Sequence, residues 1–452
     1  MDLYSIRNKL CMKDYILSRY VVLFSMDNLY LLFNSRNSAF LELNEKLYND
    51  LCDLRDGKSF SVLDDKAITD QLLSMHILVT HDEDDDFLNQ LLFEDSLDSF
   101  STDTLNITFA PTLWCNLRCP YCFETSKSRG IVSTEVCDKI IDFIKKHKLS
   151  NSLNLSWYGG EPLIAISRIE YFLKRLSEEG INLVHHSITT NGTLFNEHAL
   201  QVFEKYPLHS VQITLDGKKE RHDKIRTHDD GHGSFDEILS NLDVFSKLFP
   251  KTNVSIRVNI GKHNTDDYAY LSQLIKERYD DKFYVYPGIL QGDNDCGFTS
   301  HFFTDTEISD FFVHLIKNRM VTEIPHRQQK NCVATMLYGY VIGPKGELYK
   351  CWQDVGFKDK EIGSVLDGNF CNSALFHKYM LHGSFHNDMN CQRCKLLPTC
   401  DTGCARHRIS NVYDKKGKRN LCTHFNLNDN ESLKELLYMY YCNQKQNEHK
   451  NI

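Results

Sequence analysis

The sequence predicts an α/β fold built around a parallel barrel, and two observations lead to this prediction. From residue 105 onward, short apolar segments alternate with longer amphipathic segments, as strands alternate with the helices that cover them. The residues that can carry chemistry come directly after the predicted strands, and in parallel barrels the functional loops follow the strands at one end. Six β/α units at this spacing predict a partial (β/α)6 TIM-type barrel over residues 105–320.

Each predicted barrel strand is a short apolar run, and each predicted helix repeats apolar residues every three or four positions. The strands are expected at residues 105–111, 153–157, 183–189, 210–215, 254–260 and 283–287. The helices between them are expected at 134–146, 167–178, 197–205, 235–248 and 266–277, with one more at 304–318.

Residues 1–81 predict a small separate domain with a winged-helix-like α+β order. Its strands are expected at 20–24, 29–33, in the AFLEL segment that ends at Leu43, and at 77–80, with helices at 45–54 and 67–75. An acidic run follows, with nine Asp or Glu residues and no Lys or Arg between Asp82 and Asp103. Such a run is most simply a solvated tether, so we expect residues 82–104 to be a linker.

Composition narrows the class of protein. Hydrophobic residues make up 41% and charged residues 25% of the chain, which is ordinary for a globular protein. The net charge of −9 equals the nine acids of the linker, so the rest of the chain has no basic field for nucleic acid. No apolar run is long enough for a membrane span, and the first residues lack the features of a signal peptide. We therefore expect a cytoplasmic enzyme without nucleic-acid or membrane partners.

The first cysteine motif directly follows the first barrel strand. Cys115, Cys119 and Cys122 form a C-x3-C-x2-C array, with Tyr121 before the last cysteine. Three thiolates at this spacing can hold three corners of a cubane iron–sulfur cluster and leave the fourth iron open to a ligand. A zinc site or a redox C-x-x-C is the alternative, but structural zinc prefers four ligands in paired spacings.

This motif resembles the signature of the radical S-adenosylmethionine (SAM) superfamily. The resemblance implies that the open iron chelates the amino and carboxylate groups of SAM, and that an electron from the [4Fe–4S] cluster yields a 5′-deoxyadenosyl radical. The segment after the second strand resembles the family's GGEP motif, which contacts the SAM amino group: Gly159, Gly160, Glu161 and Pro162. The alternative is a strand-to-helix turn in which Glu161 stands near a helix start.

Two further segments resemble the family's SAM-binding surface. Thr190 and Asn191, within residues 190–193, match the motif after the third strand that lines the SAM site. Arg257 and Asn259 point to one face of the fifth strand, where buried polar groups need partners such as the SAM carboxylate or ribose. Asp216, which opens a run resembling one in the peptide- and protein-modifying branch, can instead belong to a simple Asp-Gly turn.

A second cysteine set lies after the barrel and matches the SPASM domain, here residues 321–425. Its seven positions are Cys332, Cys351, Cys391, Cys394, Cys400, Cys404 and Cys422. The resemblance implies two auxiliary [4Fe–4S] clusters, hence three clusters in all, one held by Cys391, Cys394, Cys400 and Cys422 and the other by Cys332, Cys351 and Cys404. The cluster assigned to Cys332, Cys351 and Cys404 lacks a fourth thiolate. Cys371, Cys296 or a substrate thiol can supply it, or the position can stay without a thiolate. Residues 426–452 are expected to form a C-terminal helix.

These resemblances imply a maturase that oxidatively modifies a ribosomally made precursor peptide, most simply by a C–S, C–C or C–O cross-link. Residues 1–81 resemble the leader-recognition element of such enzymes, which adds the leader to a sheet edge; the alternative is a structural cap. An electron donor such as flavodoxin or ferredoxin is implied. The sequence offers only weak candidates for a general base: Asp216, Asp354 and Glu124.

Two other functions compete with this interpretation. The first is an anaerobic sulfatase-maturating enzyme, which generates formylglycine. In that group an aspartate directly follows the cysteine that corresponds to Cys351, whereas here Trp352 follows it and Asp354 comes two residues later. The second is a non-catalytic scaffold that has kept the fold, which the intact cysteine motifs disfavour.

Overall fold

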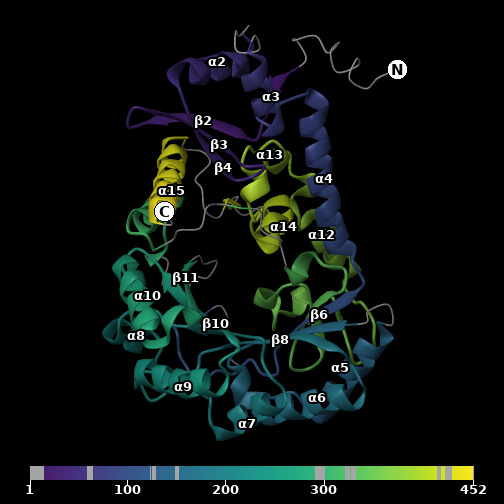
Figure 1. The fold of residues 1–452 in the computed structure, drawn as a ribbon. Coiled ribbons are helices and arrows are strands. Elements are labelled where there is room, and N and C mark those ends of the chain that lie inside the picture. The colour runs from purple at the N-terminus through teal and green to yellow at the C-terminus, as the bar shows by residue number, and fades with distance from the viewer. Residues whose placement is uncertain are drawn as a thin grey trace. The chain divides into compact units, whose positions relative to one another are not determined.

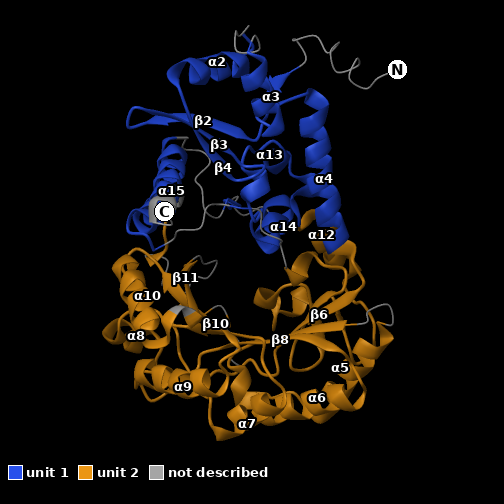
Figure 2. Cartoon of the chain, viewed as in Figure 1, with its two compact units in different colours: residues 1–98, 308–331, 384–452 blue, residues 99–307, 332–383 orange. Residues whose placement is uncertain are grey.

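The computed structural model describes residues 15–58, 65–122, 124, 129–147, 152–290, 301–320, 326, 332–414, 419–422 and 430–450. The chain divides into two compact units (Figure 2). Unit 1 contains residues 1–98, Ile308–Asn331 and Ser384–Ile452, and unit 2 contains Ser99–Glu307 and Cys332–Gly383.

The core of unit 2 is a parallel sheet whose strands follow one another in chain order (Figure 1). Its six predicted strands are β6 (Thr104–Phe109), β7 (Ser152–Trp157), β8 (Leu183–Thr190), β9 (Ser210–Thr214), β10 (Asn253–Ile260) and β11 (Phe283–Ile289). Each pairs in parallel with the next. The sheet order β11-β10-β9-β8-β7-β6-β12-β13-β14 does not close on itself, so the prediction of a partial barrel is confirmed.

The covering helices of unit 2 agree with the sequence, except that one short helix, at residues 219–225, was not expected. They are α5 (Thr134–Lys146), α6 (Ile166–Glu178), α7 (Glu197–Lys205), α8 (Lys219–Ile225), α9 (Phe235–Leu248) and α10 (Thr265–Tyr279). The apolar stripe of α6 buries Ile169, Phe172 and Leu176. Phe172 meets Phe109 of β6 and Trp157 of β7 with ring centroids 5.3 and 5.7 Å apart, which fixes this helix over the sheet.

The segment after the barrel extends the same sheet. Strand β12 (Gly339–Ile342) pairs in parallel with β6, and the short strands β13 (Glu347–Tyr349) and β14 (Gly363–Ser364) follow in antiparallel order. Helix α12 (Ser373–His382) completes unit 2, and α11 (Asp305–Lys317) begins at its border. Because β12 stands beside β6, the segment that carries Cys332 and Cys351 lies next to the strand that leads into the first cysteine motif.

Unit 1 is built on a three-stranded antiparallel sheet with the elements expected from the sequence. Its strands are β2 (Val21–Met26), β3 (Leu29–Asn34) and β4 (Ala39–Leu43), while β1 (Ile16–Leu17) pairs with β5 (Leu78–Val79). The β2–β3 turn has Asp27 at φ 50° and Asn28 at φ 62°, the left-handed pair that tight hairpins prefer. Helices α2 (Glu45–Arg55) and α3 (Lys66–Ser74) have Asn44 and Asp65 as N-caps.

Both faces of this sheet are covered, although the sequence suggested a free-standing domain. One face packs Val21, Leu23 and Leu32 against helices α2 and α3. The other packs Val22, Phe24 and Phe33 against α15 (Asn430–Lys450) and Leu396 of the cysteine-rich segment. Because residues alternate between the faces of a strand, two apolar faces required two partners, and the second comes from the C-terminal end of the sequence.

The acidic run is a helix and not a tether. Helix α4 spans His81–Phe100, and Thr80 and Glu83 form a reciprocal capping box, with Thr80 N donating to Glu83 Oε2 at 2.7 Å and Glu83 N donating to Thr80 Oγ1 at 3.3 Å. Acids in the first turn suit the positive end of the helix dipole. Phe87 and Leu91 are buried against Tyr20, which explains why the run is folded.

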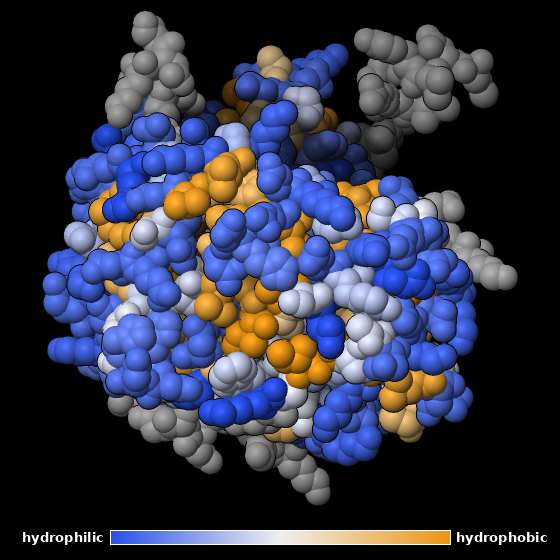
Figure 3. Space-filling model, turned by 90° about the horizontal axis from the view of Figure 1, so that it is seen from below, coloured by the Kyte–Doolittle hydropathy of each residue, from blue (hydrophilic) through white to orange (hydrophobic). Residues whose placement is uncertain are grey.

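In its described residues, the cysteine-rich segment of unit 1 forms short helices, among them α13 (Met389–Gln392) and α14 (Ala405–Tyr413). In the part of the chain that the structure describes, no helix combines the length and apolar character that a membrane span requires. The face in Figure 3 is mostly hydrophilic, with smaller apolar patches between the polar residues.

Candidate active site

The first cysteine loop leaves β6 and is shaped by its own backbone contacts. Leu117 N donates to Cys115 Sγ at 3.4 Å, and Cys122 N donates to Cys119 O at 3.2 Å. The three cysteines are half-buried and form no disulfide. Burial raises the pKa of Cys115 to about 12, so its thiolate forms at neutral pH only with a cation beside it. This donor set fits an iron–sulfur cluster, because coordinated iron takes the proton's place on sulfur.

The loop after β7 docks directly on the cysteine loop. Gly160 N donates to Thr112 O at 3.1 Å, and Glu161 N donates to Trp114 O at 2.8 Å. A Cβ on Gly159 would lie 2.3 Å from Thr112 O, and one on Gly160 would lie 2.4 Å from Trp114 O. The two glycines are therefore required so that two backbones can meet just before Cys115.

Glu161 is enclosed by protein donors. It has no exposed surface, and its carboxylate accepts from Leu163 N at 3.0 Å, Thr190 Oγ1 at 2.7 Å and Asn191 N at 2.7 Å. Burial raises its pKa, while these hydrogen bonds act in the opposite direction. Its side chain caps the short helix η2 (Pro162–Ala165), which begins at Pro162. The geometry thus agrees with the alternative in which Glu161 caps the start of a helix. The same carboxylate also joins the loop after β7 to the loop after β8.

Thr190 and Asn191 hold the cysteine loop from the other side. Asn191 Nδ2 donates to Asn116 Oδ1 at 2.8 Å and lies 3.8 Å from Cys115 Sγ. Asn116 Nδ2 in turn donates to Thr193 Oγ1 at 2.9 Å. Sequence reasoning missed Asn116, whose only signal was its place between two motif cysteines.

A polar network surrounds the aromatic residue of the cysteine motif. The Tyr121 hydroxyl donates to Asp216 Oδ2 and accepts from Arg226 Nη1 at 3.0 Å and Asn259 Nδ2 at 3.1 Å. Burial, and then the Asp216 charge, raise the pKa of Tyr121. Arg257 supports the network by donating from Nε to Asn259 Oδ1 at 2.8 Å. The motifs after β6 and β9 and the polar face of β10 therefore meet at one hydroxyl.

Two buried polar atoms of this network have no hydrogen-bond partner among the described residues: Asp216 Oδ1 and Arg226 Nε. Asp216 is 1% exposed and Arg226 8%. Leaving such atoms unpaired is costly, so a polar ligand that offers a donor and an acceptor would be stabilised here. The site beside the cysteine loop thus fits a small, polar, hydrogen-bonding cofactor.

The three candidate bases lie in different surroundings. Asp216 belongs to the Tyr121 network, and Asp354 accepts from the Tyr379 hydroxyl at 2.7 Å. Glu124 is 5% exposed, its Oε1 has no hydrogen-bond partner in the described part of the chain, and burial raises its pKa to about 7. Sequence reasoning missed Tyr158, which stacks on Trp352 at 5.5 Å and lies close enough to Glu124 for the Glu124 charge to raise its pKa, although burial is the larger cause.

Unit 1 contains five cysteines of the second set, and three of them accept hydrogen bonds on sulfur. Leu396 N donates to Cys394 Sγ at 3.4 Å, Thr402 N donates to Cys400 Sγ at 3.3 Å, and Arg408 Nη2 donates to Cys391 Sγ at 3.5 Å. Burial raises the pKa of Cys400 to about 12, with the charges of Cys394 and Cys422 nearby. Hydrogen bonds to sulfur are typical of the surroundings of iron–sulfur ligands.

The other cysteines are placed as follows. Cys332 and Cys351 belong to unit 2 and Cys404 to unit 1. Lys350 directly precedes Cys351 in the sequence. Its buried ammonium donates to Gly339 O at 2.7 Å, and burial lowers its pKa to about 7. Cys371 is exposed, and Cys296 lies outside the described residues.

Comparisons with known proteins identify similar sequences and folds. Residues 109–275 match the family described as the Radical SAM superfamily. The cysteine-type anaerobic sulfatase-maturating enzyme of Clostridium novyi (strain NT) is 26% identical over 364 residues, covering 72% of this chain and 94% of that enzyme. The radical SAM cyclopropyl synthase TigE of Paramaledivibacter caminithermalis is 25% identical over 323 residues, covering 64% of this chain and 65% of TigE.

Two solved structures share the fold. Native anSMEcpe with bound AdoMet and Cp18Cys peptide has a TM-score of 0.57 at 20% identity, covering 77% of this chain and 99% of that one. Streptococcus suis SuiB bound to precursor peptide SuiA has a TM-score of 0.51 at 15% identity, covering 90% of this chain and 99% of that one.

Proposed function

The chain is an enzyme with a radical SAM domain at residues 109–275, and from that premise we propose that it oxidatively modifies a ribosomally made precursor peptide. The modification that we propose is a C–S, C–C or C–O cross-link. The observation that carries the proposal is a basic groove along the free edge of the sheet in unit 1, where a peptide leader can add a strand.

The groove lies along β2. Among the described strands β2 pairs only with β3, so the hydrogen-bonding groups on its other edge have no strand partner. A cavity of about 250 Å³ is lined by residues 17–19 and 21–23, by Arg55 and by Lys395. An extended peptide would gain main-chain hydrogen bonds from such an edge and specificity from the side chains beside it.

The charge of the groove indicates the kind of leader it accepts. Burial lowers the pKa of Lys395, the nearby Cys394 charge acts in the opposite direction, and the positive charges of Arg55 and Lys434 lower it again. Arg55 and Lys395 line the groove together with Arg19, which is already paired with Asp84 and Asp85. Carboxylates of a bound peptide would relieve the repulsion between Lys395 and Arg55. We therefore assign the groove to a leader segment with alternating apolar and acidic side chains.

The barrel supplies the chemistry. We assign Cys115, Cys119 and Cys122 to a [4Fe–4S] cluster, which with bound SAM and one electron from the donor would supply a 5′-deoxyadenosyl radical. That radical would take one hydrogen atom from an unactivated C–H bond, and an auxiliary cluster would accept the second electron as a proton leaves and the cross-link forms. The unpaired Asp216 Oδ1 and Arg226 Nε offer an acceptor and a donor to the polar groups of SAM. Gly159 and Gly160 let the loop after β7 lie against the cysteine loop. Tyr121, which belongs to the cysteine loop, positions Asp216 and Arg226 through its hydroxyl. With the second cysteine set, the proposal includes two auxiliary clusters, three in all.

Sulfatase maturation remains a second candidate because a sulfatase-maturating enzyme is similar over 72% of this chain. The local geometry gives it less support. Trp352 occupies the position after Cys351 and stacks on Tyr158, and Asp354 accepts from Tyr379.

The deciding experiment mixes reduced, anaerobically reconstituted enzyme and SAM with a candidate precursor, taken from any short open reading frame beside the gene, and analyses the product by tandem mass spectrometry. Loss of two hydrogens per event, with fragmentation suppressed between two residues, is the expected result. An unchanged precursor together with formylglycine in a sulfatase peptide would overturn the proposal in favour of sulfatase maturation.

The groove has its own test. Binding of a fluorescently labelled leader peptide measures the role of the groove. Lys395→Glu should weaken this binding at least tenfold, because the new carboxylate repels the acidic side chains of the leader that the Lys395 ammonium attracts. Lys46→Glu is the matched control, since Lys46 is exposed on the same helix as Arg55 and does not line the groove. Equal affinity of both variants and wild type would remove the leader from this edge without touching the assignment of the barrel.

A further inference from the structure

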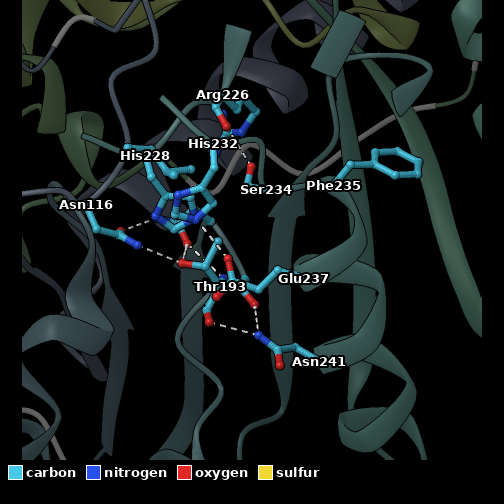
Figure 4. Close-up of polar contacts among 12 residues, drawn as sticks. Asn116, Thr193, Arg226, His228, His232, Ser234, Phe235, Glu237 and Asn241 are labelled. Carbon is cyan, nitrogen blue, oxygen red and sulfur yellow. Dashed lines mark hydrogen bonds and ion pairs between the residues drawn. The ribbon is translucent and has the colours of Figure 1, made fainter. Parts of the chain in front are cut away.

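A group of metal-ligating side chains lies on a surface turn that the proposed reaction does not use. His228, His232 and Glu237 place one ligand atom each within 4.8 Å of one another, and no other set of three His, Cys, Asp or Glu residues does so in the described part of the chain. His228 Nε2 lies 2.9 Å from Glu237 Oε2, and the two imidazole rings stack with centroids 3.9 Å apart at 14°. Figure 4 shows both rings beside Glu237.

The turn is held in the shape that brings these residues together. Thr227 and Gly233 form a β-bridge, and His228 N donates to His232 O at 2.9 Å. Gly231 has φ +88°, a backbone conformation that would be strained for a residue with a side chain. Glu237 stands in the first turn of α9, so its carboxylate comes from a second element. The three ligands are therefore positioned by a closed turn and by the start of a packed helix.

A carboxylate orients one of the imidazoles. Asp230 Oδ1 contacts His232 Nδ1, which places the proton on Nδ1 and leaves the Nε2 lone pair for a ligand. Metal-binding histidines usually donate their second ring nitrogen to such a carboxylate. This contact is a second feature of a metal site, independent of the closeness of the three ligand atoms.

We propose that His228, His232 and Glu237 bind one divalent transition-metal ion of the zinc class. Two imidazole nitrogens and one carboxylate oxygen are a ligand set that Zn²⁺ uses, with bonds of about 2.0–2.2 Å and a fourth position for water. The two stacked rings must turn so that their in-plane lone pairs converge on the ion, and the 2.9 Å contact between His228 Nε2 and Glu237 Oε2 must widen slightly. His232 and Glu237 are exposed, so both side chains are free to make this change. The bound ion replaces a proton between these groups and fastens the turn to α9.

The position of the turn gives the ion a structural consequence. Arg118 N donates to Thr227 O at 2.8 Å, and the Arg118 guanidinium pairs with Asp229 at 2.6 Å. Arg118 lies between Cys115 and Cys119 in the sequence, so the turn that binds the ion directly contacts the cysteine loop. An ion at this site is therefore a clamp on the loop that carries the cluster ligands.

The test uses holoenzyme with its clusters loaded, so that the cysteines are not free to bind the probe. Zn²⁺ alone is titrated by calorimetry, and the thermal midpoint is recorded with and without it. Wild type should bind one equivalent and show a higher midpoint, whereas His232→Ala and Glu237→Gln should bind at least tenfold more weakly. Glu237→Gln keeps a hydrogen-bonding group in place, so it separates loss of a ligand from loss of folding.

The chain offers a matched control. His198 and Glu170 form another surface His–carboxylate pair, with Nε2 and Oε2 3.0 Å apart, but no third ligand completes that pair in the described residues. His198→Ala should bind Zn²⁺ as wild type does. Zinc binding that is absent from wild type, or equal in wild type and Glu237→Gln, would overturn the proposal.

Discussion

The Thr190 hydroxyl donates a 2.7 Å hydrogen bond to Glu161 Oε1, joining the end of β8 to the loop after β7 at a carboxylate with no exposed surface. The same carboxylate accepts from two backbone N–H groups. One buried side chain thus fixes the distance between two loops that flank the first cysteine motif.

Replacing Glu161 by Gln should loosen this junction. The new amide can still accept at one atom but places an NH2 group against a backbone N–H, which leaves a buried donor unsatisfied at a cost of about 1–3 kcal/mol. We expect a lower thermal midpoint and a lower iron content after anaerobic reconstitution. Glu170→Gln, at an exposed position, should change neither quantity.

Removing the hydroxyl of Tyr121 should weaken SAM binding. Tyr121→Phe deletes the group that joins Asp216, Arg226 and Asn259, so all three lose a partner in a buried site. A loss of about 1–3 kcal/mol corresponds to roughly 5- to 150-fold in affinity. Equilibrium binding of SAM to the reconstituted protein measures the change. Tyr270→Phe is the control because Tyr270 is 40% exposed on α10, and unchanged affinity in Tyr121→Phe would remove this network from the SAM site.

Adding one methyl group at Gly160 should remove the first cluster. The Cβ of Gly160→Ala would lie 2.4 Å from two carbonyl oxygens, those of Leu113 and Trp114, so one of the two loops has to move. We expect the reconstituted variant to lack the iron of one cubane while the second cysteine set still binds iron. Gly180→Ala strains a left-handed residue that has open space around it, so it should lower stability by about 1 kcal/mol and keep the iron content.

The protein should lose stability in mild acid through His186. Trp157 Nε1 donates to His186 Nε2 at 2.8 Å, and His186 Nδ1 lies 3.1 Å from Pro207 O, so the native ring is neutral. Burial lowers its pKa to about 4, below the usual 6.5. Between these values the unfolded chain binds more protons than the native one, so the free energy of unfolding falls as the pH falls, by about 3 kcal/mol in full.

Urea unfolding at pH 7, 5.5 and 4.5 checks this expectation. His186→Gln should be less stable at pH 7 and should show a shallower loss of stability with acid than wild type. The same slope in both proteins would assign the acid sensitivity to other groups.

The sequence predicted the barrel well because each strand and helix carries its own local signal. The helix at Thr134–Lys146, for example, follows from apolar residues at helical spacing, and the structure has the same bounds. Helix α4 escaped prediction because its acids suggested solvation, whereas the buried Phe87 and Leu91 on its other face decide its folding. The packing of α15 on β2 and β3 depends on residues far apart in the sequence, which no local pattern reports.

The site was predictable in its parts but not in its connections. The cysteine loop and the residues after each strand were correctly expected at one end of the sheet. That Tyr121 reaches Asp216, Arg226 and Asn259 follows only from the three-dimensional placement of the cysteine loop, the segment after β9 and strand β10. Asn116 and Asn264 were missed for the same reason, since an asparagine in a loop carries no signal of its own; Asn264 supports the network by donating to Asn259 O at 2.8 Å.

The sheet of unit 1 packs against a helix from the C-terminal end of the sequence, and this sets the order in which parts of the chain can fold during synthesis. The Tyr441 hydroxyl donates to Glu42 across 399 positions of sequence, and Leu433 and Leu437 cover the apolar face of β2 and β3. Until α15 has left the ribosome, that face is exposed on the nascent chain, where apolar strands are prone to aggregation. The barrel is complete in sequence before that moment, so it can fold first, and the strands that are made earliest acquire their final partner last.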